Sequence, residues 1–300
     1  MVKINVLGND RSKPPETSSG RALTAWYLAR ALEADGPLDV PETCDIAVAV
    51  DDPSLLGTVE AKRYYLWVTT TAVDLRAVRR WVGNGRGKIV VAASERVKAH
   101  ARRVGLSVRC IVPLGACGTF AAAAARDPDL RRNVYLADDE WGAATVRGIE
   151  AFGVAHERVA GLRLTVLGTG ERSPELVEAL RRLPDDAVTV AEAPLAHSAM
   201  PAAVGGQGIL VHLPIGAERG LAVREALVAG RAVVSNTTGV LGSVILGTGH
   251  GTDVKEAGMQ IARLARSDDA FLSACDRNKR QGKRLGLAWS AVGARWRAMF

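Results

Sequence analysis

One stretch decides the fold of this chain: Gly208-Ile-Leu-Val-His-Leu-Pro-Ile-Gly-Ala-Glu-Arg-Gly-Leu-Ala-Val-Arg-Glu-Ala-Leu-Val-Ala-Gly-Arg-Ala-Val-Val-Ser235. Its first apolar run, residues 209–213, is too short for a helix and does not alternate with polar residues. We therefore expect a strand with both faces covered, as in a parallel sheet. Gly216 and Gly220 then allow the chain to turn tightly.

The second half of the stretch predicts a helix and a returning strand. Apolar residues recur at helical spacing over residues 221–229, and Gly230 ends the helix. Residues 232–235 form the second strand. Such a unit places a helix N-terminus at the carboxyl edge of a sheet, where backbone N–H groups and the helix dipole favour a bound phosphate.

The same alternation of strand and helix recurs along the chain. It predicts an α/β protein with two Rossmann-like parallel sheets, joined by an Ala-rich, Pro-ended linker at residues 121–129. The strands of the first sheet are expected at residues 3–7, 44–50, 64–69, 88–92 and 108–112, with helices at 21–34, 73–82 and 95–104. Those of the second sheet are expected at residues 133–137, 162–167, 187–190, 209–213 and 232–235.

The composition indicates a globular protein in a reducing compartment. Its 300 residues, 48% of them apolar, suffice for two domains with real cores. The four cysteines form no CxxC pair and no cluster with His at ligand spacing, so we expect neither a disulfide framework nor a metal site. No signal segment and no apolar run of membrane-spanning length is present. We expect a cytoplasmic protein.

The run Gly220-Leu221-Ala-Val-Arg-Glu225-Ala resembles the donor-site signature of glycosyltransferase family 4, Glu-Gly-x-Gly-Leu-Pro-x-x-Glu-Ala-x-x-x-Gly. The leading Glu of that signature would align on Ala217, and the nearest acid, Glu218, comes one residue later. The resemblance implies that Glu225 binds the ribose of a nucleotide sugar and that Glu218 lies beside the sugar. The Gly220 and Leu221 N–H groups would bind the diphosphate. The alternative is that Glu225 is a solvated helix residue.

Other segments carry the same resemblance more weakly. The run Ile111-Val-Pro-Leu-Gly115-Ala-Cys-Gly-Thr-Phe120 looks like the end of the family's N-terminal domain, and Gly168-Thr169-Gly170 looks like its Gly-x-Gly loop, although a tight turn would explain that loop equally well. The implied fold is GT-B, with two domains facing across a cleft. The domains would be residues 1–122 for the acceptor and 123–285 for the donor, and residues 286–300 would form a helix returning to the first. The loop that begins at Gly8 would lie over the cleft and contact the donor.

One segment departs from the family. After the first strand of its second domain the family places an Arg and a Lys, which neutralise the departing diphosphate, whereas this chain has Asp138, Asp139 and Glu140. These acids would point away or hold a divalent ion. Because the charge that develops on the leaving group needs fixed cations, other residues must supply them if the chemistry is kept. The candidates are Arg219, Arg224, Arg11 and Lys13.

The positive charge is concentrated in the first half. Between residues 60 and 113 twelve basic residues stand against three acidic ones, a net charge of +9, compared with +7 for the whole chain. Such a surface favours an anionic acceptor. We select Arg79, Arg80, Arg102 and Arg103 as acceptor-binding residues. Four tryptophans could add stacking, although aromatic residues near sheets belong more often to a core: Trp67, Trp81, Trp289 and Trp296. Nucleic acid is favoured over an anionic lipid surface, and a bias of composition toward Arg is the remaining alternative.

The resemblance to the family implies a hexosyl or pentosyl transferase that acts with retention. It would use a UDP- or GDP-sugar donor without a metal or other cofactor, and Glu218 and Arg219 would be catalytic. The favoured acceptor is a hydroxyl group on a modified DNA base. The alternatives are a lipid or small-molecule glycosyltransferase, and a non-catalytic nucleic-acid-binding module that keeps the fold.

Overall fold

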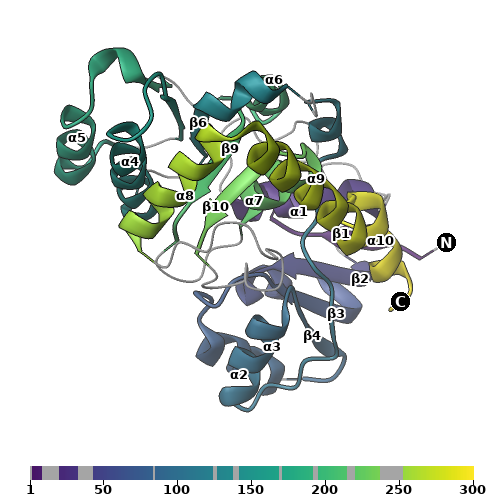
Figure 1. The fold of residues 1–300 in the computed structure, drawn as a ribbon. Helices are drawn as coiled ribbons and strands as arrows, with labels where there is room; N and C mark the ends of the chain where they lie inside the picture. Colours follow the sequence, from purple (N-terminus) through teal and green to yellow (C-terminus); the bar gives the residue numbers. More distant parts are fainter. Residues whose placement is uncertain are drawn as a thin grey trace. The chain divides into compact units, whose positions relative to one another are not determined.

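The computed structural model describes residues 2–8, 20–32, 43–83, 85–123, 127–137, 142–168, 171–191, 195–214, 220–236 and 253–300. These residues divide into two compact units. Unit 1 contains the described residues up to Gly115 together with Gly286–Phe300, and unit 2 contains those from Ala116 to Leu285. Each unit is an α/β layer structure with a parallel sheet of five strands, which confirms the predicted fold class (Figure 1).

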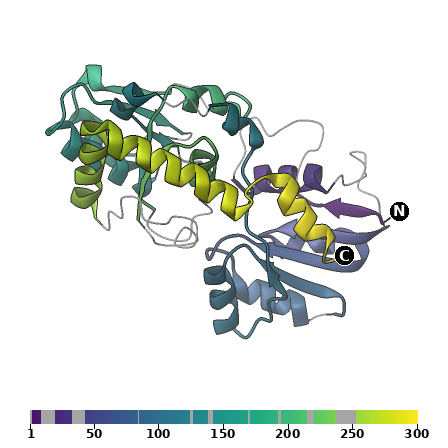
Figure 2. The ribbon, with the colours of Figure 1, turned by 45° about the vertical axis from the view of Figure 1, so that its right-hand side comes forward.

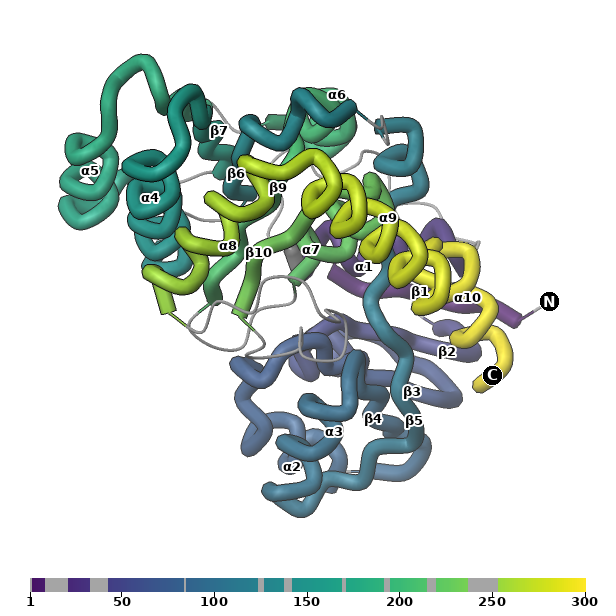
Figure 3. Tube along the Cα trace, in the orientation of Figure 1, coloured from purple at the N-terminus to yellow at the C-terminus, as the bar shows by residue number. Residues whose placement is uncertain are grey.

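The sheet of unit 1 has the strand order β1-β2-β3-β4-β5, which follows the chain without reversal (Figure 3). Its strands are β1 (Ile4–Val6), β2 (Thr43–Val50), β3 (Glu60–Val68), β4 (Lys88–Ala92) and β5 (Cys110–Ile111). Strand β3 begins four residues before the expected residue 64. Its polar start pairs with β2, where Lys62 Nζ lies 2.7 Å from Asp45 Oδ1. The apolar pattern of the sequence does not reveal this start of the strand, because backbone pairing with β2 and an ion pair stabilise it.

Four α-helices of the described residues cover the sheet of unit 1. They are α1 (Gly20–Ala31), α2 (Leu75–Gly83), α3 (Glu95–Arg103) and α10 (Trp289–Arg297). A short 3₁₀ helix, η1 (Pro53–Gly57), lies between β2 and β3. Helices α1 and α10 lie side by side and pack on alternate residues of the strands, such as Val48 and Tyr65 (Figure 2). This packing forms the apolar core of unit 1.

Three of the four tryptophans proposed for base stacking belong to this core. Trp67 and Trp296 are fully buried with their rings 5.6 Å apart, and Trp289 is 8% exposed. The stacking prediction is therefore wrong for these three, because the face of the sheet beneath α1 and α10 needs large apolar side chains. The fourth, Trp81, is half-buried, and the Lys88 ammonium lies 5.3 Å from the centre of its ring.

Two glycines let the last helix approach this core closely. A Cβ atom at Gly293 would lie 2.4 Å from the Ala31 carbonyl oxygen of α1, and one at Gly115 would lie 2.6 Å from the Trp289 ring. Both distances are below van der Waals contact, so larger residues would push α10 away. The C-terminal segment thus completes the core of unit 1.

The sheet of unit 2 has the order β10-β9-β6-β7-β8, all parallel. Its strands are β6 (Asn133–Ala137), β7 (Arg163–Leu167), β8 (Val188–Val190), β9 (Ile209–His212) and β10 (Ala232–Ser235). The chain starts at the central strand β6, runs outward to β8, and then returns to the other side of β6 as β9. The strand order therefore reverses between β6 and β9, which is where open α/β sheets bind ligands.

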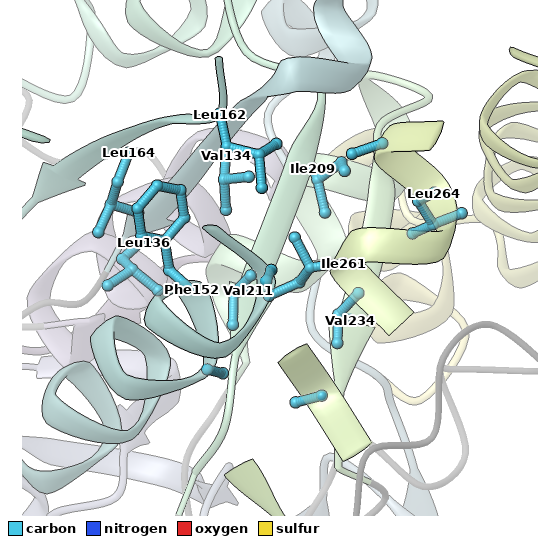
Figure 4. Close-up of a cluster of buried hydrophobic side chains, with 14 of the residues drawn as sticks. Val134, Leu136, Phe152, Leu162, Leu164, Ile209, Val211, Val234, Ile261 and Leu264 are labelled. Atoms are coloured by element: carbon cyan, nitrogen blue, oxygen red, sulfur yellow. The ribbon is translucent and has the colours of Figure 1, made fainter. Parts of the chain in front are cut away.

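The helices of unit 2 enclose a large apolar core (Figure 4). They are α4 (Ala143–His156), α5 (Pro174–Arg181), α6 (Met200–Gly205), α7 (Leu221–Val228), α8 (Val254–Arg266) and α9 (Asp268–Leu285), with 3₁₀ turns η2 (Gly118–Ala123), η3 (Pro128–Arg132) and η4 (Asp185–Ala187). Phe152 of α4 and Ile261 of α8 meet strand residues such as Val134 and Val211 in this core. Residues of β6, β7, β9 and β10 all contribute to this core.

Candidate functional site

The carboxyl edge of the unit 2 sheet is fixed where β9 and β10 end. Asn236, which is 4% exposed, donates a hydrogen bond from Nδ2 to the Pro214 carbonyl oxygen at 2.8 Å. The Ser235 hydroxyl donates to the Asn236 carbonyl oxygen at 3.1 Å. The residues that follow these two neighbouring strands are therefore tied together beside the point where the strand order reverses.

Helix α7 begins at this edge, as the sequence predicts. Its N-cap is Gly220, with φ 65° and ψ 39°, a left-handed conformation that glycine adopts without strain. Glycine brings no side chain to accept hydrogen bonds from the first-turn N–H groups. The positive end of the α7 dipole thus lies at the carboxyl edge of the sheet, which is the geometry that binds phosphate groups.

Glu225 lies within the protein and not on its surface. It is 6% exposed, so the alternative that it is a solvated helix residue is wrong. Its helix neighbour Arg224 is only 1% exposed, and Arg224 Nη1 donates to the Gly220 carbonyl oxygen at 3.3 Å. Burial lowers the pKa of the Arg224 guanidinium to about 10, so the group remains a cation at neutral pH. Side chains of a helix lean toward its N-terminus, which directs this cation toward the start of α7.

No pattern in the sequence pointed to a histidine at this site, yet the structure places His197 beside Glu225. His197 Nε2 lies 3.7 Å from Glu225 Oε1, and the two side chains are 12% and 8% exposed. The Phe120 ring of η2 lies 5.9 Å from the His197 ring. These three residues come from separate parts of the sequence, and only the topology of the sheet brings them together.

Two further buried groups surround Glu225. Burial raises the pKa of the Tyr135 phenol of β6, and the nearby Glu225 carboxylate adds to this shift while the Arg231 guanidinium opposes it. Arg231, 1% exposed, donates from Nη2 to the Gly205 carbonyl oxygen at 2.9 Å and also to the Ala123 carbonyl oxygen. The carboxylate therefore sits in a buried polar cluster on the α7 side of the sheet.

The remaining predicted site residues have different outcomes. Gly168 follows β7 at the same edge of the sheet, and Gly8 follows β1 in unit 1 with φ 81°, where a Cβ atom would meet Leu55 Cδ1 at 2.9 Å. Their roles, like those of Gly220, Leu221 and Glu225, stay predictions. The others lie outside the described residues: Thr169, Gly170, Glu218, Arg219, Arg11, Lys13, Asp138, Asp139 and Glu140.

The predicted acceptor-binding residues lie on the surface of unit 1. Arg79 and Arg80 of α2 and Arg102 and Arg103 of α3 are all exposed. A hollow of about 560 Å³ is lined by Asp74, Arg76, Arg79 and Arg80. A side chain at Gly105 would lie 3.9 Å from Arg79 Cζ, so the α2 arginines adjoin the turn that follows α3. We call the exposed arginines of α2 and α3 the basic surface.

Two kinds of feature are absent from the described ranges. There, no group of three or more His, Cys, Asp or Glu side chains is placed to hold a metal ion. No helix in those ranges has both the length and the apolar character needed to cross a membrane.

Comparison with known proteins shows the fold. No family model and no curated protein matches the sequence. Solved structures do match: HepE from Anabaena in complex with UDP and glucose has a TM-score of 0.67 at 11% identity, with 92% of this chain and 80% of HepE covered. Sucrose-phosphate synthase from Thermosynechococcus elongatus has a TM-score of 0.64 at 15% identity, covering 85% and 73%.

A third similar structure is a TarM variant from S. aureus in complex with fondaparinux, alpha-GlcNAc-glycerol and UDP. Its TM-score is 0.63 at 11% identity, with 91% of this chain covered. The chain spans only 58% of the length of that TarM chain. These similarities show that the chain has the two-domain GT-B fold of these glycosyltransferases.

Proposed function

We propose that this protein is a glycosyltransferase that uses a nucleotide sugar and binds it on unit 2. One observation carries the proposal: Glu225 is buried on a helix that starts at a left-handed glycine, next to the point where the strand order reverses. The fold is that of glycosyltransferases, and similar structures such as HepE and TarM are complexes with UDP.

In this proposal the parts of the site have distinct roles. The Glu225 carboxylate accepts hydrogen bonds from the ribose hydroxyls, and the N–H groups of Gly220 and Leu221 bind the diphosphate. Gly168, Thr169, Gly170 and Gly8 complete the donor site. Arg224 and Arg219 offset the charge that grows on the departing diphosphate. Glu218 contacts the transferred sugar, which keeps its anomeric configuration as in the family that the signature resembles.

The test is calorimetric titration with UDP and GDP, first on the wild type. Glu225→Gln should weaken binding of the preferred nucleotide by about 1.5 to 3 kcal/mol, because it removes hydrogen bonds to a charged group. The matched control is Glu178→Gln, which neutralises a half-exposed carboxylate on α5 of the same unit. If the wild type binds neither nucleotide, the non-catalytic module replaces the proposal. Equal affinities of the wild type and Glu225→Gln would remove Glu225 from the donor site.

For the acceptor we propose an anionic molecule, with a modified base in DNA favoured over a lipid. The basic surface supports this, since exposed arginines that contact phosphates release bound counterions. Replacing Arg79, Arg80, Arg102 and Arg103 by Gln should lower the slope of log affinity against log salt by about 0.9 for each phosphate that is no longer neutralised. Binding of the nucleotide should not change.

The matched control for this variant replaces four exposed arginines of unit 2, Arg158, Arg172, Arg181 and Arg182, by Gln. It changes the net charge equally but leaves the basic surface intact, so its DNA affinity should follow the wild type at each salt concentration. Vesicles with anionic lipids are tested in parallel. Tight binding to vesicles with none to DNA would favour the lipid acceptor, and equal effects of both variants would show that only net charge matters.

A further inference from the structure

His197 stands in a turn that is fixed independently of the donor site. The turn precedes α6, and its backbone is held by the bond from the Ala199 N–H to the Ala196 carbonyl oxygen at 2.8 Å. A second bond joins the Met200 N–H to the His197 carbonyl oxygen at 3.2 Å. The Phe120 ring, tilted by 55°, packs against the imidazole. The turn and the contact with Phe120 together set the position of the His197 ring.

The His197 ring points a nitrogen at the carboxylate of Glu225. Nε2 lies 3.7 Å from Oε1, about half an ångström beyond the range of an N–H···O hydrogen bond. Both side chains are nearly buried, so water screens their interaction only weakly. In the part of the chain that the structure describes, the other charged or titratable groups near Glu225 are Arg224 on its own helix, Arg231 after that helix, and Tyr135 on β6.

A buried carboxylate needs such a neighbour for two reasons. Its charge is costly to bury unless polar groups compensate it, and its side chain must be held in one rotamer if it is to meet two hydroxyl groups of a ribose at once. Arg231 is already committed to the carbonyl oxygens of Gly205 and Ala123. Among the described residues, His197 brings a ring nitrogen to within 3.7 Å of Oε1.

We propose that His197 is the positioning residue of the donor site, holding the Glu225 carboxylate in the orientation that receives the ribose 2′- and 3′-hydroxyls. This inference rests on the proposed function, because it assumes that Glu225 binds a ribose. His197 acts through Glu225 and does not itself contact the nucleotide. Its contribution is therefore confined to ligands that carry these hydroxyls.

The experiment compares UDP with 2′,3′-dideoxy-UDP on four proteins: the wild type, His197→Phe, His197→Gln and Glu225→Gln. Phe keeps the ring packing against Phe120 but lacks the N–H, and Gln can place an N–H close to the Nε2 position. UDP should bind His197→Phe about tenfold more weakly than the wild type, because the ring nitrogen that faces the Glu225 carboxylate is lost. His197→Gln should recover most of that affinity. Dideoxy-UDP should bind all four proteins with similar affinity.

A structural role for His197 would give another pattern, because a distorted site would lose affinity for UDP and dideoxy-UDP alike. That pattern, or unchanged UDP affinity in His197→Phe, would overturn the inference. If His197→Phe does not fold, His197→Leu provides a second side chain without an N–H. Failure of the proposed function is distinguishable, since the wild type would then bind neither UDP nor GDP. If Glu225 binds the ribose but His197 does not position it, UDP binding will be weakened in Glu225→Gln and unchanged in His197→Phe.

Discussion

The two sheets of the molecule contain the same number of parallel strands but differ in their order. In unit 2 the order reverses between β6 and β9, and the buried Glu225 and the start of α7 lie on this side of the sheet. In unit 1 the described strands follow the chain in sequence. Open α/β sheets bind ligands where the strand order reverses, so the described strands form such a place in unit 2 and not in unit 1.

The two units also use arginine differently. Arg224 and Arg231 of unit 2 are each 1% exposed and hold individual carbonyl oxygens. The arginines of the basic surface in unit 1 are exposed. A buried cation interacts strongly with a few partners and is little affected by salt, whereas exposed cations act together and are screened. The arginines at the candidate site of unit 2 are thus buried, whereas those of the basic surface in unit 1 are open to solvent.

The largest expected effect separates the stabilities of the two units. Trp296→Ala removes a fully buried side chain from the core of unit 1 and should lower the free energy of unfolding of that unit by about 3 to 5 kcal/mol. Nucleotide binding on unit 2 should be unchanged under conditions where both units are folded. Urea unfolding followed by tryptophan fluorescence measures the destabilisation, since five of the six tryptophans belong to unit 1. Phe152→Ala is the matched variant in the core of unit 2, and it should destabilise that unit instead.

The next effect tests the proposed catalytic role of Arg219. Arg219→Ala should lower turnover by roughly 100-fold and nucleotide affinity much less, because a cation that meets charge developing in the transition state acts mainly on the rate. Steady-state kinetics with the preferred donor measures both quantities. Equal losses in affinity and turnover would make Arg219 a ground-state binding residue.

A smaller effect on stability tests the packing at the start of β9, the strand next to the reversal of strand order. A Cβ atom at Gly208 would lie 2.0 Å from the Leu130 carbonyl oxygen, so Gly208→Ala should destabilise unit 2 by about 1 to 3 kcal/mol through overpacking. Gly206→Ala is the control, because no atom lies within 4 Å of a Cβ there. Thermal unfolding of the two variants, with and without UDP, measures the difference. Equal melting temperatures of the two variants would show that β9 can move away from Leu130 without loss of stability.

The smallest effect concerns an ion pair at the edge of the unit 1 sheet. Hydrogen bonds from Ser54, together with the Arg21 guanidinium, lower the pKa of the Asp52 carboxyl group. The ionised form therefore stabilises unit 1 above the ordinary pKa of Asp, and this stability is lost as the pH falls through the lowered value. Because the pair is partly exposed, Asp52→Asn should cost less than about 1 kcal/mol at pH 7. The variant and the wild type should converge in acid unfolding curves below that pKa.

Much of this architecture follows from local patterns. Buried parallel strands are short continuous apolar runs, so residues 209–213 and 232–235 were identifiable as strands, and a glycine before an apolar helix marked the start of α7. The order of the strands was not predictable, because it depends on contacts between distant segments. The sequence indicated Glu225 because that residue belongs to a local motif. It did not indicate His197, which is brought to Glu225 only by contacts between distant segments.

The tryptophans show a different limit of sequence reasoning. A large aromatic side chain near a basic segment suits a nucleic-acid surface and, more often, a core, and its place on the pleated sheet decides between them. Trp67 lies on the same face of β3 as Tyr65, and that face meets α1 and α10. Helix α10 comes from the other end of the chain. The local sequence around Trp67 therefore does not show that this side chain packs beneath a helix.

The return of the chain to unit 1 has a consequence for its synthesis. The core of that unit includes Trp289, Val292 and Trp296, which leave the ribosome after the whole of unit 2. Domains generally fold in the order in which they are made, yet here the first unit to emerge lacks part of its interior until the second has been translated. Nascent chains arrested before residue 289 should therefore expose an apolar face of unit 1 to chaperones, while unit 2 can already bury its own core.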